Sequence, residues 1–377
     1  YEPRYDAEGQ LQGIDPIDSA VPARISKQTW RGNTLSHSTV ITPEAAWPSI
    51  HMVEVVRSCP ELCRFCLASY LTLPFRTPSL DDGLIPAVEQ GMKATRRLGL
   101  LGASVTQHPQ FNDLLQWLGQ PQFDDTRISV SSVRAATVTP QLATSLANRG
   151  SKSITIAIES GSERLRQVVN KKLSESEIHA AARYAKEGGL SALKLYGMAG
   201  LPSEKDEDIE ATASLLMALK KATPGLRLSL GVSSFVPKAH TPFQWQGVRP
   251  EAEKRLKLLA KRLKPKGIEL RPESYGWSVI QALLSRSDRR LAPVIAAVRG
   301  KSDSQGSWKR AYKELKSDLP PWDDVVHGCW SSQRVLPWEH LEGPLPKSTL
   351  AKHQAAALTD GAKPLSAALP TESSPQH

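Results

Sequence analysis

The chain has 377 residues and a formal net charge of +10, with 40% hydrophobic and 23% charged residues. No stretch is apolar enough to span a membrane and no signal-peptide pattern opens the chain, so we expect no membrane partner. The four cysteines, three of them clustered, suit a reducing compartment, so we expect a cytoplasmic protein. The positive charge fits either an ordinary solvated surface or binding of an anionic partner such as RNA.

Residues 1–49 carry scattered Pro, Gly, Asp and Ser without a sustained period, which predicts an irregular lead-in or a linker remnant. The sequence opens on Tyr1 rather than methionine, so we expect a missing upstream domain. From residue 50 onward, apolar strand-like runs alternate with helical stretches. The six runs span residues 51–56, 98–105, 127–133, 152–158, 191–198 and 226–235. This alternation predicts an α/β fold with a parallel sheet, doubly wound or a barrel, whose site lies at the carboxyl ends of the strands.

The pattern changes after residue 246. Residues 247–344 read as mainly helical, which predicts a helical C-terminal extension to an α/β core of residues 50–246. Residues 345–377 are rich in Ala, Pro, Ser and Lys and contain few large apolar side chains, so we expect a disordered tail. We find no internal repeat.

Three of the four cysteines lie in one short loop directly after the first strand. Cys59, Cys63 and Cys66 have Cys-x3-Cys-x2-Cys spacing, and thiolates are the usual ligands of iron–sulfur clusters. Three thiolates on a cubane would leave one iron open to a substrate or cofactor. The alternatives are free buried thiols, or a structural zinc site completed by the distant Cys329 or a histidine.

This loop, with Phe65 immediately before its third cysteine, resembles the signature of the radical S-adenosylmethionine (SAM) superfamily, and the resemblance extends over residues 50–246. It implies a partial (β/α)6 TIM-like barrel holding a [4Fe-4S] cluster on Cys59, Cys63 and Cys66. It also implies that SAM binds the open iron and is cleaved reductively to methionine and a 5'-deoxyadenosyl radical. That radical would serve hydrogen abstraction from, or methylation of, a substrate that the sequence does not identify.

Later segments extend the resemblance and imply further cofactor contacts. Glu159 and Ser160 match the motif that meets the SAM ribose, and Lys171 falls where related enzymes place a basic residue against the SAM carboxylate. For Glu159 and Lys171 the alternative is an ordinary solvated charge at a helix end, and for the glycine-proline turn it is a tight turn without a ligand. The residues of that turn, which the resemblance places near the adenine, are Gly197, Gly200 and Pro202.

A degenerate motif follows the second strand. "LGAS" (101–104) occupies the position where the family's "GGE" sequence meets the SAM amino group through backbone carbonyls. Gly102 matches that motif, whereas Ala103 and Ser104 replace its second glycine and its acid. The resemblance therefore implies main-chain contacts from these three residues to SAM.

Residues 233–245 and 283–295 resemble a radical SAM subgroup related to the tRNA methylthiotransferase and elongator branch. Members are often fused behind an N-terminal cobalamin-binding domain, so cobalamin is a further expected cofactor through the missing upstream domain. An electron donor such as flavodoxin or ferredoxin is the expected protein partner. Phe243 and Trp245, at the end of the last strand, either line a substrate pocket or pack the barrel against the C-terminal helices.

Cys329 has three interpretations: a buried structural thiol, a catalytic hydrogen-atom donor, or a distal ligand. Two alternative functions also remain open. A tRNA-modifying enzyme of methylthiotransferase type would need three further cysteines for its second cluster, and this chain has only Cys329 left. A non-enzymatic zinc or iron–sulfur scaffold would agree with the degenerate "LGAS" motif.

Overall fold

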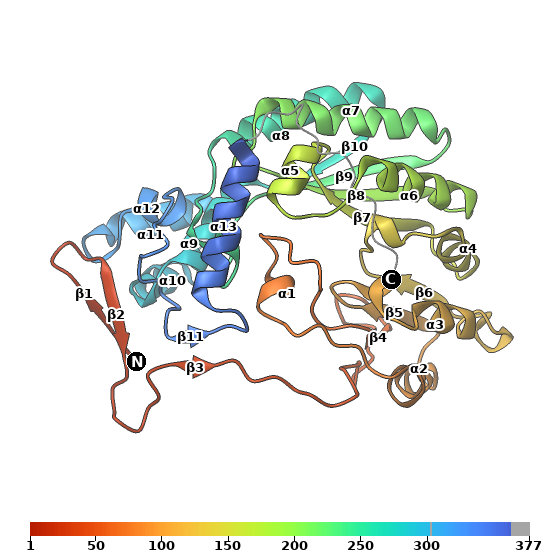
Figure 1. The fold of residues 1–377 in the computed structure, drawn as a ribbon, viewed down its shortest axis with the longest axis horizontal. Helices are drawn as coiled ribbons and strands as arrows, with labels where there is room; N and C mark the ends of the chain where they lie inside the picture. The colour runs from red at the N-terminus through yellow and green to blue at the C-terminus, as the bar shows by residue number, and fades with distance from the viewer. Residues whose placement is uncertain (302–303, 363–377) are drawn as a thin grey trace.

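The computed structural model describes residues 1–301 and 304–362 (Figure 1). Its central feature is an arc of parallel strands in two sheets, joined by a parallel bridge between Val133 and Ile156. The first sheet has the order β4 (His51–Glu54), β5 (Arg97–Leu101), β6 (Arg127–Val130). The second continues as β7 (Ser153–Glu159), β8 (Ala192–Ala199), β9 (Arg227–Ser234), β10 (Glu269–Pro272). The expected α/β fold with a parallel, barrel-like sheet is confirmed.

Helices follow the strands and cover one face of the arc. They are α1 (Leu67–Tyr70) and α2 (Ile85–Met92) after β4, α3 (Phe111–Trp117) after β5, α4 (Pro140–Asn148) after β6, α5 (Glu163–Val168) and α6 (Glu175–Glu187) after β7, α7 (Asp206–Ala222) after β8, and α8 (Glu251–Leu263) after β9. Leu193 and Leu195 of β8 are fully buried in the core that includes these helices. Lys194 and Tyr196, which alternate with them, are exposed. The opposite face of β8 is therefore exposed at these two residues.

The parallel sheet is one strand longer than the sequence suggested. β10 pairs in parallel with β9 and lies within the stretch predicted to be helical from residue 247. It has four residues, of which only Leu270 is buried, so it lacks the apolar run that marks the longer strands.

The N-terminal segment is more regular than predicted. β1 (Glu2–Tyr5) and β2 (Leu11–Asp15) form an antiparallel hairpin, so the prediction of an irregular lead-in is wrong for these residues. The two-residue β3 (Ile25–Ser26) pairs in parallel with β11 (Leu341–Glu342). The lead-in thus joins the C-terminal part of the chain.

The segment after β10 is mainly helical. It contains α9 (Tyr275–Arg286), α10 (Ala292–Val298), α11 (Gln305–Glu314) and α12 (Trp322–Val326), which share a second apolar core. No helix within the described residues is long and apolar enough to cross a membrane.

A final helix, α13 (Lys347–Ala362), lies where the sequence predicted a disordered tail from residue 345. That prediction is wrong for α13, because Leu350 and Ala357 are buried against side chains from distant parts of the chain. A helix stabilised in this way shows no strong apolar period of its own. The rest of the predicted tail, residues 363–377, lies outside the described residues.

Candidate functional site

The three clustered cysteines lie on the loop that leaves the carboxyl end of β4. Cys59 and Cys63 are buried and Cys66 is partly buried. The backbone N–H of Cys66 donates to the carbonyl of Cys63 at 2.8 Å, so the last two thiols belong to one tight turn. Ser58 and Leu62 have φ angles of 74° and 55°, left-handed values that cost energy in residues with a side chain. The surrounding structure therefore holds this loop in a specific, strained shape.

The triplet supplies thiol ligands, and within the part of the chain that the structure describes no nearby histidine or carboxylate is grouped with it. Among the described residues, no group of three or more His, Cys, Asp or Glu side chains is arranged to hold one metal ion. A cubane cluster presents a separate iron to each thiolate, so the thiols need not converge on a single atom. Three thiols on one loop are therefore compatible with a cluster.

Cys329 does not join the triplet in such a group. It is exposed, and its sulfur accepts from Arg249 Nη2 at 3.4 Å and donates to Gln246 Oε1 at 3.7 Å. The interpretation as a buried structural thiol is therefore wrong. Its predicted role as a hydrogen-atom donor stays a prediction.

Glu159 and Lys171, predicted separately as cofactor ligands, form an ion pair. Lys171 Nζ lies 2.7 Å from Glu159 Oε1, and the two side chains are only 11% and 9% exposed. Glu159 follows a register shift near the end of β7 and has a φ of 64°, so a bulge turns the chain at this point. The expectation of solvated helix-end charges is wrong for both residues.

This ion pair lies beside the cysteine loop, as the electrostatics of Cys63 show. Burial raises the pKa of the Cys63 thiol to about 12, and the positive charge of Lys171 acts against this rise. For Lys171, burial acts to lower the pKa, but the charges of Glu159 and Cys63 and the hydrogen bond to Glu159 outweigh it, and the pKa is raised. Lys171 thus stays charged and favours a thiolate at Cys63.

The loop is clamped to the segment that carries Lys171. The Arg64 backbone N–H donates to the Val169 carbonyl at 3.0 Å, and its guanidinium donates to the Val168 carbonyl at 2.8 Å. Asn170 Nδ2 donates to the carbonyl of Leu62 at 2.9 Å. Three hydrogen bonds therefore fix the spacing between the thiols and the cation.

A polar network that the sequence did not reveal supports the other side of the loop. Glu61, between the first two cysteines, accepts from Gln107 Nε2 at 2.7 Å and pairs with Arg134 at 3.0 Å. The Ser104 hydroxyl donates to Gln107 Oε1. In the sequence, these residues were marked only by their position after neighbouring parallel strands. Because the carboxyl ends of such strands meet at one edge of the sheet, that position alone indicated that they could lie close together.

The "LGAS" residues lie at this same edge. Gly102 has a φ of 153°, and a Cβ there would lie 2.7 Å from the Val56 carbonyl oxygen, so only glycine fits. Its own carbonyl accepts from Ser131 Oγ at 3.1 Å. Ala103 is exposed, whereas Ser104 is buried and bonded into the Gln107 network. Their contacts with SAM stay predictions.

The side chains of two other predicted residues already contact neighbouring parts of the fold. Ser160 is 2% exposed, and its hydroxyl accepts from the Ser162 N–H at 3.1 Å and lies 3.4 Å from Thr212 Oγ1 of α7. Phe65 packs against an apolar cluster that contains Phe243. Phe243 and Trp245 are fully buried, which supports the packing interpretation for both.

The glycine-proline turn packs against α8. Gly200 has a φ of 81°, and a Cβ there would lie 2.8 Å from the Ala252 Cβ, while a Cβ on Gly197 would lie 3.2 Å from the Glu159 carbonyl oxygen. Pro202 is buried. Packing within the fold thus explains both glycines, and the contact with adenine stays a prediction.

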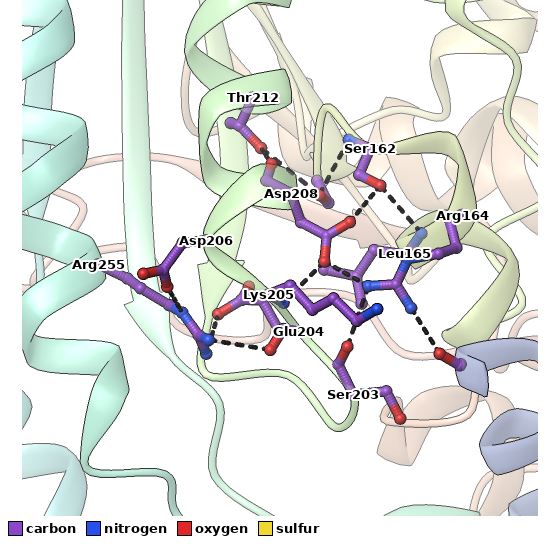
Figure 2. Close-up of polar contacts among 12 residues, drawn as sticks. Ser162, Arg164, Leu165, Ser203, Glu204, Lys205, Asp206, Asp208, Thr212 and Arg255 are labelled. Carbon is purple, nitrogen blue, oxygen red and sulfur yellow. Dashed lines mark hydrogen bonds and ion pairs between the residues drawn. The ribbon is translucent and has the colours of Figure 1, made fainter. Parts of the chain in front are cut away.

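The same turn leads into a buried ionic network that the sequence also did not reveal (Figure 2). Asp208 of α7 is fully buried, pairs with Arg164 of α5, and accepts from Ser162 Oγ at 2.5 Å and from the Lys205 N–H at 2.8 Å. It fixes the start of α7 against the start of α5, next to the segment that carries Lys171.

Comparison with known families decides the class of this site. The model of the radical SAM superfamily matches residues 53–216, which include the cysteine loop, Glu159, Lys171 and the glycine-proline turn. Residues 53–216 belong to the radical SAM superfamily. The radical SAM domain is an enzyme domain, and the superfamily implies a [4Fe-4S] cluster and SAM as its cofactors.

A similar curated protein extends beyond the radical SAM domain. An uncharacterized protein of Methanocaldococcus jannaschii, MJ0966, is 36% identical over 253 residues, which cover 66% of this chain and 54% of the relative. The chain thus spans about half the length of this relative.

Solved structures resemble the chain more distantly. Coproporphyrinogen III oxidase from Escherichia coli, a radical SAM enzyme, gives a TM-score of 0.42 at 18% identity and covers 58% of this chain and 52% of its own. The radical SAM methyltransferase TsrM from Kitasatospora setae, with cobalamin and a [4Fe-4S] cluster bound, gives a TM-score of 0.45 at 12% identity. The match covers 71% of this chain and 60% of TsrM. Similarities this weak do not bear on the function of this chain.

Proposed function

We propose that this chain is a radical SAM enzyme that binds a [4Fe-4S] cluster through Cys59, Cys63 and Cys66 and cleaves SAM reductively. One observation carries the proposal: the buried Glu159–Lys171 pair lies beside the buried Cys63 thiol, at the carboxyl edge of the parallel strands. Residues from two separate motifs of the radical SAM domain thus meet at one place, where α/β enzymes hold their ligands.

The residues present fit the cluster. The donors are three thiols, the ligand type that iron–sulfur clusters use, and the Lys171 cation beside them offsets the negative charge of thiolates. When bound, the cluster supplies the electron that cleaves SAM into methionine and a 5'-deoxyadenosyl radical. Because burial keeps the free Cys63 thiol protonated, this thiol releases its proton when it becomes a ligand.

Glu159 and Lys171 are proposed to bind and orient SAM. Lys171 offers an ammonium group to the SAM carboxylate, and Glu159 offers a carboxylate to the ribose hydroxyls. In the structure the two side chains satisfy each other, which keeps both buried charges paired until the cofactor replaces one partner.

The substrate is proposed to approach the face of the arc on which β8 carries exposed side chains. Tyr196 on this face is 51% exposed, and the neighbouring Lys194 is exposed as well. An electron donor such as flavodoxin or ferredoxin is proposed to reduce the cluster. The expectations of RNA binding, a tRNA substrate and an upstream cobalamin domain stay predictions.

The test is anaerobic reconstitution with iron and sulfide, reduction with dithionite, and quantitation of 5'-deoxyadenosine formed from SAM. We expect the wild type to bind iron and sulfide and form 5'-deoxyadenosine, and Cys63→Ala to lose both properties. Cys329→Ala is the matched control for iron content, which should stay at the wild-type level.

Two results would overturn the proposal. One is zinc in place of iron in the purified and reconstituted protein, which would support a scaffold. The other is a fully loaded [4Fe-4S] protein that binds no SAM, measured by equilibrium dialysis.

A further inference from the structure

The C-terminal helix α13 packs against α5 (Figure 1). Its side chains also contact the cysteine loop and α1. Ala357 is fully buried in an apolar cluster with residues of α5, and Phe65, next to Cys66, packs against this cluster. Leu350 is buried together with Tyr70, the last residue of α1, which begins directly after Cys66. The helix thus contacts the loop and the segment that follows it.

Polar contacts tie α13 to the loop at two further points. Arg64, between Cys63 and Cys66, pairs with Asp360 at 3.1 Å, and the two side chains are 12% and 24% exposed. The Tyr70 hydroxyl lies 2.8 Å from His353 Nδ1 and 3.2 Å from the Leu62 carbonyl oxygen. Arg64 and Tyr70 therefore each contact α13 and the immediate surroundings of the thiols.

The far end of α13 is held as well. Arg164 Nη1 donates to the Gly361 carbonyl at 2.9 Å, and the same guanidinium pairs with Asp208 in the network of Figure 2. A Cβ on Gly361 would lie 2.3 Å from Ser203 Oγ, so the end of the helix meets the glycine-proline turn closely. The helix is thus a fixed part of the fold and connects that turn to the cysteine loop.

Arg64 has a role that depends on α13. Its guanidinium already donates to the carbonyls of Gln167 and Val168, and Asp360 is the carboxylate that balances its charge. Removing Asp360 would leave a mostly buried cation with neutral acceptors only, which weakens the clamp between the loop and the Lys171 segment.

We propose that α13 is part of the cluster-binding unit, with Asp360 and His353 as positioning residues that hold the cysteine loop closed for the cluster. This inference rests on the proposed function, because it assigns the loop to the cluster. It goes further in giving a helix well outside the matched domain a direct part in cofactor binding.

The first test measures cysteine alkylation in the reduced, metal-free protein, with mass spectrometry resolving each thiol. We expect Asp360→Ala and His353→Ala to raise the rates at Cys63 and Cys66 about five- to tenfold, because loss of a partly buried contact promotes local opening. Cys329, which α13 does not hold, should react at the wild-type rate and serves as the internal control.

The second test reconstitutes the same variants with iron and sulfide and records the electron paramagnetic resonance spectrum after reduction. We expect less bound iron and an altered spectrum for Asp360→Ala, and wild-type values for the conservative Asp360→Glu. Lys352→Ala removes an exposed charge from the same helix and should behave as wild type in both tests. Circular dichroism checks that each variant is folded. If Asp360→Ala does not fold, Asp360→Asn takes its place.

Wild-type alkylation rates in folded Asp360 and His353 variants would overturn the proposal. So would faster alkylation with unchanged iron content and spectrum, because the helix would then hold the loop without serving the cluster. Failure of the proposed function is distinguishable: the wild type itself would then bind no iron or no SAM, whereas alkylation needs neither.

Discussion

Lys171 and Glu159 form a buried charge pair beside the cysteine loop. Both are nearly buried and depend on each other for charge balance, and Lys171 also acts on the pKa of Cys63. Two such charges lose hydration when the protein folds, so each needs an opposite charge nearby. A ligand carboxylate can pair with Lys171, and ligand hydroxyl groups can donate hydrogen bonds to the Glu159 carboxylate while Lys171 stays nearby.

The pair should be energetically coupled. We expect Lys171→Met to lower the free energy of unfolding of the metal-free protein by about 3 kcal/mol, because the Glu159 carboxylate stays buried without a partner. In the double variant with Glu159→Gln, the free energy of unfolding should fall by less than the sum of the decreases in the two single variants. Urea unfolding measures these values, and Lys172→Met, at the exposed next residue, is the control. Additive losses would show that the pair is not coupled.

Glu204 gives a stability that depends on pH. Burial raises its pKa to about 7 from an ordinary 4.5, against the lowering effects of the Gly200 N–H and Arg255. Between these two values the folded protein keeps a proton that the unfolded chain has released. The free energy of unfolding should therefore fall by about 3 kcal/mol as the pH rises from about 4.5 to 7.

Urea titrations of the wild type and Glu204→Gln across this pH range test the effect. The variant carries no titrating group at this position, so its stability should fall less than that of the wild type. Parallel curves for the two proteins would contradict the assignment to Glu204.

At this scale the sequence singled out residues that the structure brings close together, but it did not predict their contacts. Cys59, Cys63 and Cys66 stood out by their spacing, and Glu159 and Lys171 by motif. The Glu159–Lys171 ion pair and the Glu61 network were not predictable, because those contacts join residues that only the fold brings together. The hydroxyl of Ser160, predicted to meet the cofactor, lies against Thr212 of α7 instead.

At the scale of elements, the relation between α5 and α7 depends on Asp208. Its carboxylate joins groups from both helix starts inside the core. We expect Asp208→Asn to lower the free energy of unfolding by about 3 to 5 kcal/mol, since Arg164 loses its carboxylate partner while buried.

The matched control is Asp206→Asn, which removes an acidic group two residues earlier that is 77% exposed. It should change stability by less than about 1 kcal/mol, because exposed ion pairs contribute little. Chemical denaturation measures the free energy of unfolding of both variants. Equal decreases in the two variants would contradict a special role for the buried Asp208 carboxylate.

Elements were predictable where their own residues stabilise them. β7 and β8 alternate buried and open positions over seven and eight residues, and their periodicity is visible in the sequence. β10 and α13 were missed because both are stabilised mainly by partners distant in sequence, β10 by pairing with β9 and α13 by packing on α5 and the cysteine loop. Such elements lack a strong local signal.

At the scale of the whole molecule, the N-terminal segment contacts the part of the chain that follows β10. β3 pairs with β11, and the Ser26 hydroxyl donates to Glu342 at 2.8 Å. Arg290, after α9, donates to the Gly9 carbonyl at 3.0 Å and stacks over the Tyr5 ring. The predicted lead-in and the helical C-terminal extension, which the sequence placed at opposite ends of the radical SAM core, thus contact each other directly.

The Arg64–Asp360 contact also concerns the order in which the protein is made. The two residues are 296 positions apart. At typical synthesis rates the ribosome needs about 15 to 60 seconds to add that many residues. During this interval the nascent chain carries three thiols whose covering helix has not yet been synthesised. Iron delivered in that interval would meet an open loop, whereas iron delivered after translation has passed Asp360 would meet a loop that α13 contacts.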